Sequence, residues 1–375
     1  MHYLDYAATT PVPEEVAQVM LAVLTQNFGN PSSQYQLGRE AKKLVDDSRA
    51  MLAKALDCKP EQVFFTSCGT ESDNWAIRAA LHQNRRVGKH IVTTAAEHSA
   101  VLQCVKQLEQ EGYSAAYVKP DSQGRITADQ IAAALREDTA LVSVMLVNNE
   151  TGVRFPVEEI AALLKDRPTL LHTDAVQGFM KVPFTTKSLG ADFVTISAHK
   201  IGGPKGIGAL YIGGKAKNTR PMLFGGGQES GLRPGTEATA QIAGFAKAAE
   251  LRILNRDKID KHIADCYKYA AEKLKSIPTL QIISSGDARH ILTVSLPGYP
   301  SQNIVSELSE QDIYISAGSA CHRGKASHVF TAMGLPKKTA AGTVRISFGL
   351  ETTTADIDAL AEALAEHQRT RFPML

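Results

Sequence analysis

The sequence predicts an α/β protein whose main domain is a mostly parallel β-sheet between layers of helices. Strand-like and helix-like patterns alternate through the first two-thirds of the 375 residues, and repeated strand–helix–strand units place neighbouring strands in parallel. After a long helical pattern that begins near residue 238, short strands and a closing helix predict a smaller α+β domain. We therefore expect a large domain over 14–250 and a smaller domain built from 1–13 and 251–375.

Each element of the main domain is predicted from its own pattern. A helix is expected to open at Pro13 and Glu14, because apolar residues follow them at amphipathic spacing. Short β-rich runs predict strands at 63–66, 91–93, 141–147, 170–173, 193–196 and 209–212. Between the earlier strands, helical segments are expected at 97–111, 127–136 and 156–165.

The tail is interpreted in the same way. The helical pattern from residue 238 runs past residue 270 without an obvious glycine or proline break before Pro278. Strand-like runs follow at 281–283, 291–296 and 344–348, and a last helix is expected over 354–368. One long helix would therefore join the two domains.

Composition and charge exclude several classes of function. The residues are 43% hydrophobic and 21% charged with a formal net charge of +2, so no overall field favours nucleic acid or a membrane surface. No apolar run is long enough to cross a bilayer, and the first residues lack the pattern of a secretion signal. The five cysteines (Cys58, Cys68, Cys104, Cys266 and Cys321) form no C-x-x-C pair. This predicts reduced thiols in a cytoplasmic protein and no metal site.

The strand at 193–196 is followed directly by a cluster of functional side chains. Ser197, His199 and Lys200 come first, and a glycine-rich stretch follows them. A lysine at the end of a core strand can be partly desolvated, which lowers its pKa and frees the amine for Schiff-base chemistry. Taken alone, a solvated loop lysine is the simpler interpretation of Lys200.

Two further motifs follow strands. Gly69 and Thr70 lie at a strand-to-helix turn, and Thr70 to Asp73 fits the [ST]-x-x-[DE] capping box, so free N–H groups there could bind a phosphate. Asp174 and Gln177 follow the strand at 170–173, where a buried carboxylate needs a cationic partner such as a protonated pyridine nitrogen. Alone, an ordinary helix cap explains the first motif more simply, and a capping aspartate explains the second equally well.

Three shorter motifs complete the set. Glu97–His98 follows a strand, so the imidazole could lie flat on an aromatic ring; 148–152 is a polar turn after an apolar strand; and 232–236 precedes the long helix. Active sites of parallel sheets form beyond the carboxyl ends of the strands. The joint occurrence of a lysine, an aspartate and a phosphate turn at these ends predicts pyridoxal phosphate (PLP) as cofactor.

With these motifs, the chain resembles the cysteine desulfurases of the NifS/IscS-like group, within the fold type I, class-V aminotransferase family of PLP enzymes. The matching blocks run nearly end to end: Tyr3–Thr10, Gly29–Ser33, Thr70–Asn74, Glu97–His98, Asn148–Glu150, Asp174–Gln177, Ser197–Lys200, Arg233–Thr236, Ala317–Cys321 and Val344–Ser347. The resemblance implies a seven-stranded type of sheet, L-cysteine as substrate and a homodimer.

The resemblance also implies a role for each site residue. Lys200 would hold the cofactor covalently and move protons, Asp174 would pair with the pyridinium nitrogen, Gln177 would contact the phenolic oxygen, and His98 would stack on the ring and also transfer protons. Further cofactor contacts are implied at Gly69, Thr70, Asn149, Ser197, His199 and, from the second subunit of a dimer, Thr236. Substrate contacts are implied at Asn149, Asn30 and Arg345. Of these, Arg345 suits the α-carboxylate because a guanidinium binds a carboxylate in a bidentate pair.

Cys321 would be the nucleophile, in a loop of the smaller domain. Its thiolate would attack the sulfur of the substrate, leaving a persulfide on Cys321 and releasing L-alanine. An acceptor protein would then take the sulfur for iron–sulfur clusters, thiolated tRNA or another thio-cofactor. A mobile loop would serve that delivery.

Other functions remain open at this point. Selenocysteine lyase or cysteine-sulfinate activity would use the same site, an aminotransferase would need Lys200 and Asp174 but not Cys321, and a non-catalytic scaffold would need none of them. The chain departs from the family pattern at Cys68, at Tyr35 and at 322–324, and the last of these leaves the acceptor open.

Overall fold

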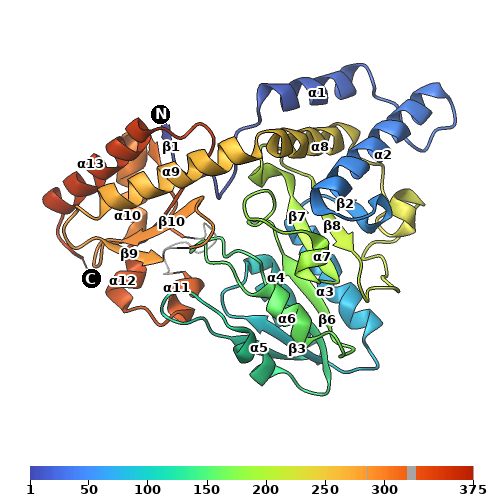
Figure 1. Cartoon of the computed structure of the whole chain (residues 1–375), viewed down its shortest axis with the longest axis horizontal. Helices are drawn as coiled ribbons and strands as arrows, with labels where there is room; N and C mark the ends of the chain where they lie inside the picture. Colours follow the sequence, from blue (N-terminus) through green and yellow to red (C-terminus); the bar gives the residue numbers. More distant parts are fainter. Residues whose placement is uncertain (285, 319–326, 375) are drawn as a thin grey trace.

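The computed structural model describes residues 1–284, 286–318 and 327–374, so Cys321 lies outside the described residues. Figure 1 shows a large sheet surrounded by helices and, beside it, a smaller sheet packed under two long helices. No helix in these described ranges is long and apolar enough to cross a membrane.

The large sheet confirms the predicted α/β fold. Within the described chain it has seven strands in the order β2-β8-β7-β6-β5-β3-β4. Strands β3 to β7 pair in parallel, whereas β8 is antiparallel to both β2 and β7. The bounds are β2 Val63–Thr66, β3 His90–Thr94, β4 Ser114–Val118, β5 Thr139–Ser143, β6 Leu170–Asp174, β7 Phe193–Ser197 and β8 Gly208–Ile212.

Helices cover both faces of this sheet because successive side chains of each strand point to opposite sides. In β2, Phe64 packs with Trp75 against α3, while Val63 and Phe65 belong to the core on the other face. Helices α3 (Gly69–Gln83) and α4 (Ser99–Gln110) cover the first face. The other face is covered by α1 (Glu14–Thr25), α2 (Gln36–Leu56), α5 (Ala128–Ala134), α6 (Val157–Leu163), α7 (Thr186–Leu189) and α8 (Thr239–Leu254).

The smaller sheet has its own core. Strand β10 (Ile291–Ser295) pairs antiparallel with β9 (Gln281–Ser284) and with β12 (Thr343–Ser347). Apolar residues of β10 and β12 pack against α9 (Arg256–Leu274), α10 (Ser301–Glu310) and α13 (Thr354–Thr370). A short strand β1 (His2–Tyr3) pairs in parallel with β11 (Ile313–Tyr314), so the N-terminus belongs to this part of the fold. The domain boundaries at 14 and 250 stay a prediction.

The single long helix predicted from residue 238 is wrong, because the structure divides it at Asn255. Asn255 leaves the helical conformation at φ −111° and ψ 15°, and its Nδ2 donates to the carbonyl of Leu251 at 3.0 Å. Helix α8 before the break packs on the large core and α9 after it packs on the small core. The strand predicted over 141–147 also differs, since β5 spans Thr139–Ser143.

Candidate active site

A cavity of about 320 Å³ lies at the carboxyl ends of β6 and β7, where parallel sheets place their active sites. It contains nearly all of the predicted site residues. Those in its wall are Gly69, Thr70, His98, Asn149, Asp174, Gln177, Ser197, His199, Lys200 and Arg345.

Lys200 enters this cavity from a single 3₁₀ turn that follows β7. Its Nζ donates to the carbonyls of Ala7 and Ala8 at 2.8 and 2.7 Å, so the N-terminal segment holds the amine. Burial and the nearby guanidinium of Arg345 lower the pKa of Lys200 to about 8, although Asp5 and Asp174 oppose the shift. An amine with this pKa is far more often neutral, and therefore nucleophilic, than an exposed lysine.

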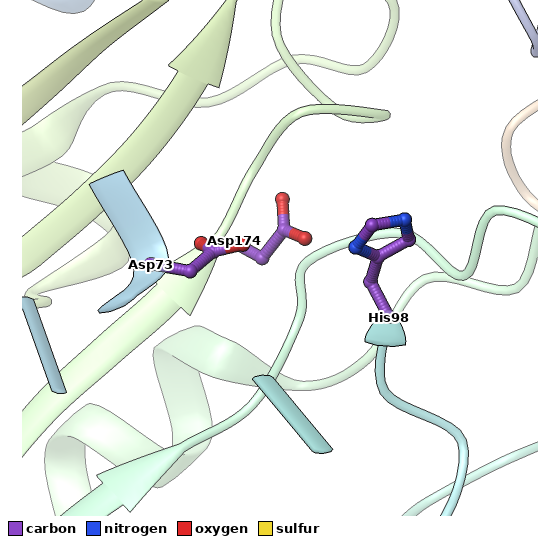
Figure 2. Close-up of side chains that lie close together, drawn as sticks. All are labelled: Asp73, His98 and Asp174. Atoms are coloured by element: carbon purple, nitrogen blue, oxygen red, sulfur yellow. The ribbon is translucent and has the colours of Figure 1, made fainter. Parts of the chain in front are cut away.

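Asp174, Asp73 and His98 all line this cavity. Figure 2 shows that their side chains lie close together, and one ligand atom of each lies within 4.8 Å of the others. Burial, and then the neighbouring carboxylate of Asp73, raise the pKa of Asp174 to about 7, while His98 opposes the shift. Asp174 Oδ1 also accepts a hydrogen bond from the backbone N–H of Val176 at 2.9 Å. The structure thus combines both interpretations of Asp174, since it caps the turn and still offers a buried carboxylate to a cation.

His98 is placed by the start of α4. Its Nδ1 accepts a hydrogen bond from the backbone N–H of Ala100 at 3.2 Å, so the neutral ring carries its proton on Nε2. The preceding Glu97 is fully buried and accepts hydrogen bonds from the N–H of Met145 at 3.0 Å and from Thr94 Oγ1 at 2.7 Å. These bonds fix the loop that orients the imidazole.

The predicted capping box from Thr70 to Asp73 is wrong. Helix α3 begins at Gly69, two residues earlier than a box with Thr70 as N-cap requires, and its N-cap Cys68 makes no side-chain capping bond. Asp73 instead lies at the buried wall of the cavity, where its Oδ1 is 3.4 Å from Nε2 of buried His172. Glu71 takes over the local contacts by accepting from the backbone N–H of Ser67 at 2.8 Å.

The residues around the cavity fit PLP. The hydroxyl of Ser197 is buried without a hydrogen-bond partner among the described residues, which leaves it free for a phosphate oxygen. A Cβ on Gly69 would lie only 3.0 Å from Val176 Cγ2, so glycine allows close approach to the first turn of α3, whose N–H groups suit an anion. Asp174 offers the carboxylate that a protonated pyridine nitrogen requires.

Arg345 forms the side of the cavity suited to a substrate carboxylate. Its two terminal nitrogens donate to the carbonyl of Asn149 and to Asp5 Oδ1, each at 2.8 Å. Its Nε is buried and has no partner in the described part of the chain. A guanidinium held at two points, with a free donor, is prepared to bind an anion.

The described residues on both sides of the Cys321 segment are anchored beside the cavity. Ser316 exchanges backbone hydrogen bonds with Arg345 at 2.7 and 3.1 Å, and Gly318 lines the cavity wall. On the other side, the Nε2 of His328 in α11 (His328–Ala332) lies 3.0 Å from the carbonyl of Glu97, next to His98.

Two predicted site residues lie elsewhere. Asn30 and Thr236 are both exposed and absent from the described wall of the cavity. Asn30 Oδ1 accepts from the backbone N–H of Ser32, whereas Thr236 lines a separate cavity beside Arg233. Conversely, Asp5 and Ser316 line the active-site cavity without having been predicted. Asp5 lies in the N-terminal matching block, so that block was the available signal.

Comparisons with known proteins agree with this geometry. A family model described as aminotransferase class-V matches residues 2–360. The chain is 38% identical to a cysteine desulfurase IscS of Methanosarcina thermophila, over 97% of this chain and 91% of the relative. It is 41% identical to a cysteine desulfurase of Nostoc sp., over 97% and 92% of the two chains.

Solved structures give the same result at the level of the fold. A NifS-like protein superimposes with a TM-score of 0.92 at 34% sequence identity, covering 98% of this chain and 99% of the other.

Proposed function

This chain belongs to the class-V aminotransferase family and is a PLP-dependent cysteine desulfurase, and on that basis we propose that it transfers the sulfur of L-cysteine to Cys321 and then to an acceptor. The observation that carries the proposal is the convergence of Lys200, Asp174 and Arg345 in one cavity. The two anchored ends of the segment that contains Cys321 support it, because they bring the chain to the same cavity.

The cofactor would be held by residues at the ends of four strands, β2, β3, β6 and β7. Lys200 would bond to its aldehyde carbon, Asp174 would pair with its ring nitrogen, and His98 would lie against its ring. Its phosphate would be bound by Gly69, Thr70, Ser197 and His199. When bound, PLP withdraws electrons from the Cα of the substrate and so makes its proton removable.

The residues of the chain would then do the following work. The free Nε of Arg345 and its terminal nitrogens would bind the α-carboxylate, which fixes the direction of the Cα–H bond. Lys200, released from the carbonyls of Ala7 and Ala8, would accept the Cα proton on Nζ and later return a proton to the product. The lowered pKa of Lys200, about 8, suits both transfers near neutral pH.

Cys321 would perform the sulfur transfer. Its thiolate would form a bond to the substrate sulfur while the Cβ–S bond of the substrate breaks. The electron pair of that bond stays with the carbon fragment, which takes up a proton and leaves as alanine. The balance is one L-cysteine and one thiol giving one L-alanine and one persulfide.

We also propose that the enzyme is a homodimer. Leu223 and Phe224, in the segment that leads to Thr236, are 51% and 87% exposed, and large exposed apolar side chains favour burial against another chain. Thr236, exposed in its own chain, would then contact the phosphate in the partner site.

Delivery to iron–sulfur clusters, thiolated tRNA or a thio-cofactor, and a cytoplasmic location, stay predictions.

The test is to incubate the protein with cysteine and a thiol reductant and to measure sulfide and alanine. Cys321→Ala should keep the yellow colour of the bound cofactor but lose most sulfide release. Equal sulfide from Cys321→Ala and wild type would contradict the role of Cys321. Cys266→Ala is the matched control, because Cys266 is buried beside α13 and away from the cavity.

A second measurement addresses the cofactor and the alternative activities. Borohydride reduction followed by peptide mapping should place the cofactor on Lys200, and an unmodified Lys200 would refute the assignment. Selenocysteine supplied at equal concentration tests the lyase alternative. A tenfold higher kcat/KM for selenocysteine than for cysteine, about 1.4 kcal/mol, would favour it.

A further inference from the structure

The amide of Gln177 lies between two cavities, and its two polar atoms face different partners. Its Nε2 donates to the carbonyl of Ala7 at 2.8 Å. Its Oε1 lies 3.2 Å from Nζ of Lys181 and 3.4 Å from Nε2 of His290. Gln177 lines the cofactor cavity, Lys181 and His290 line a second cavity of about 200 Å³, and Lys200 lines both.

These partners determine the direction of the amide. Burial and the surrounding positive charge of Lys181, Arg252, Arg345 and Lys200 hold the pKa of His290 well below its ordinary range, so its neutral ring can donate through Nε2. Burial, followed by Lys200, Arg252 and Arg345, likewise lowers the pKa of Lys181, and its amine donates in either protonation state. Two donors therefore fix the oxygen of Gln177. One of the two N–H bonds of its amide donates to the carbonyl of Ala7 in the wall of the cofactor cavity, and the second N–H bond is a further donor on the same nitrogen.

The position of Lys181 is set by the turn that joins it to Gln177. Gln177 and Lys181 are four residues apart on a helical turn, in which the N–H of Lys181 bonds to the carbonyl of Gly178 at 3.0 Å. The intervening Met180 has φ +57°, a left-handed conformation that a methionine adopts only at a cost in free energy. Arg252 donates to the Met180 carbonyl and holds this conformation. Strain retained at a residue beside an active site is a reason to look for a functional contact.

The N–H of Gln177 is a neighbour of the reactive amine. Gln177 Nε2 and Lys200 Nζ both donate to the carbonyl of Ala7, each at 2.8 Å. In PLP the ring hydroxyl lies on the carbon next to the one that carries the aldehyde. A donor beside Lys200 is therefore positioned to meet that oxygen once Lys200 has bonded to the aldehyde carbon.

We propose that Lys181, together with His290, is a positioning residue that fixes the amide of Gln177 with its N–H facing the cofactor. The inference rests on the proposed function, because it assigns Gln177 a contact with the bound cofactor. A correctly turned N–H stabilises the anionic form of the ring oxygen and so lowers the pH at which the bound cofactor loses its proton. Loss of Lys181 frees the amide to turn its oxygen toward the ring, where it would repel that anion.

The test uses the holoenzyme and follows the visible absorbance of the bound cofactor as a function of pH. Lys181→Met should raise the midpoint of this titration by about one pH unit. It should lower kcat more than it raises KM for cysteine, because Lys181 does not line the substrate cavity described above. Lys181→Arg keeps a donor and should return the midpoint toward wild type. The matched control is Lys187→Met, which removes an exposed lysine paired with Asp57 and should change neither quantity.

A second pair of variants separates positioning from charge. Gln177→Ala should raise the midpoint by a similar amount, and adding Lys181→Met to it should give no further shift. A full additional shift in the double variant would overturn the proposal, because Lys181 would then act on the cofactor directly through its charge. If Lys181→Met does not fold, His290→Phe removes the other donor to the same oxygen and carries the same expectation.

Failure of this inference differs from failure of the proposed function. An unchanged midpoint in Lys181→Met, with wild type carrying the cofactor on Lys200 and releasing sulfide, would overturn the role of Lys181 alone. Absence of the Lys200 adduct or of sulfide from wild type would instead contradict the function itself.

Discussion

Lys200 lies among charges of both signs, and their balance determines when its amine can react. Burial and Arg345 lower its pKa to about 8 from 10.5, while Asp5 and Asp174 act in the opposite direction. Asp5 and Arg345 are also paired with each other at 2.8 Å. A substitution of either Asp5 or Arg345 should therefore change the pKa of Lys200 measurably.

Capture of PLP by the protein stripped of its cofactor should accelerate as the pH rises through about 8, because only the neutral amine attacks the aldehyde. Arg345→Met removes a like charge and should move this midpoint upward, whereas Asp5→Asn removes an opposite charge and should move it downward. Stopped-flow absorbance measures the rate. A wild-type midpoint near that of an exposed lysine, or shifts of both variants in one direction, would contradict this account.

Most residues of the cavity could be predicted because parallel strands bring their carboxyl ends together. Lys200, Asp174 and His98 each lie at or just after the end of such a strand. Their positions in the sequence were therefore sufficient to predict that they meet in one site. Asp73 was interpreted wrongly, because a local capping pattern does not reveal that the helix starts two residues earlier and turns Asp73 toward His172 of the sheet. Asp5 was missed because its partner Arg345 lies 340 residues away in the sequence.

At the scale of elements, the start of α3 is held by one ion pair. Glu71 in its first turn pairs with Arg233 at 2.8 Å and accepts from the N–H of Ser67. Burial opposes ionisation, but the hydrogen bonds from Arg233 and Ser67 hold the pKa of Glu71 below its ordinary range. The pair thus joins the candidate phosphate turn to the segment that precedes α8.

Glu71→Gln should cost about 1–2 kcal/mol in the free energy of unfolding and weaken retention of the cofactor about tenfold, because glutamine lacks the charge and replaces one of the two acceptor oxygens with an NH2 donor. Urea unfolding and the rate of cofactor release measure the two effects. Glu111→Gln is the matched control, since its pair with Arg78 is about 40% exposed on both sides and should contribute less than about 0.5 kcal/mol. Equal effects of the two substitutions would show that the position of Glu71 is irrelevant.

The elements themselves were predicted unevenly, for physical reasons. Helix α2 is missing from the prediction although its apolar residues recur at helical spacing, as in Val45, Leu52 and Leu56. Strand β4 is at the edge of the sheet and only partly buried, so it lacks the apolar run that marked the inner strands. No glycine or proline marks the break between α8 and α9 at Asn255. The break arises because α8 packs on the large core and α9 packs on the small core, and local helix propensity does not reveal this.

Over the whole molecule, the N-terminal segment connects the two sheets to the active site. Strand β1 pairs with β11, the backbone at Leu4 and Asp5 meets Ser347 of β12, and the carbonyls of Ala7 and Ala8 accept from Lys200. The smaller sheet thereby contributes Arg345 and the larger sheet contributes Lys200 to one cavity. The site depends on the relative position of both parts.

The proposed dimer gives a further prediction at this scale. Lys200→Met and Thr236→Glu should each be inactive alone, and their co-expression should restore about a quarter of wild-type activity, because half of the dimers then contain one intact site. The measurement is sulfide release by the purified mixture, with each single variant as its control. If Thr236 served its own chain, or no phosphate at all, no such recovery pattern would appear.

Trp75 is the only tryptophan of the chain, and it is buried on α3, the helix whose first turn faces the cavity. All tryptophan fluorescence of the chain therefore comes from this one side chain, whose Nε1 donates a 2.7 Å hydrogen bond to the carbonyl of Arg220. Bound PLP absorbs in the region where tryptophan emits, so filling the cavity should dim this fluorescence by energy transfer. The fluorescence of Trp75 should therefore report how much of the protein holds the cofactor, without turnover and without an added label.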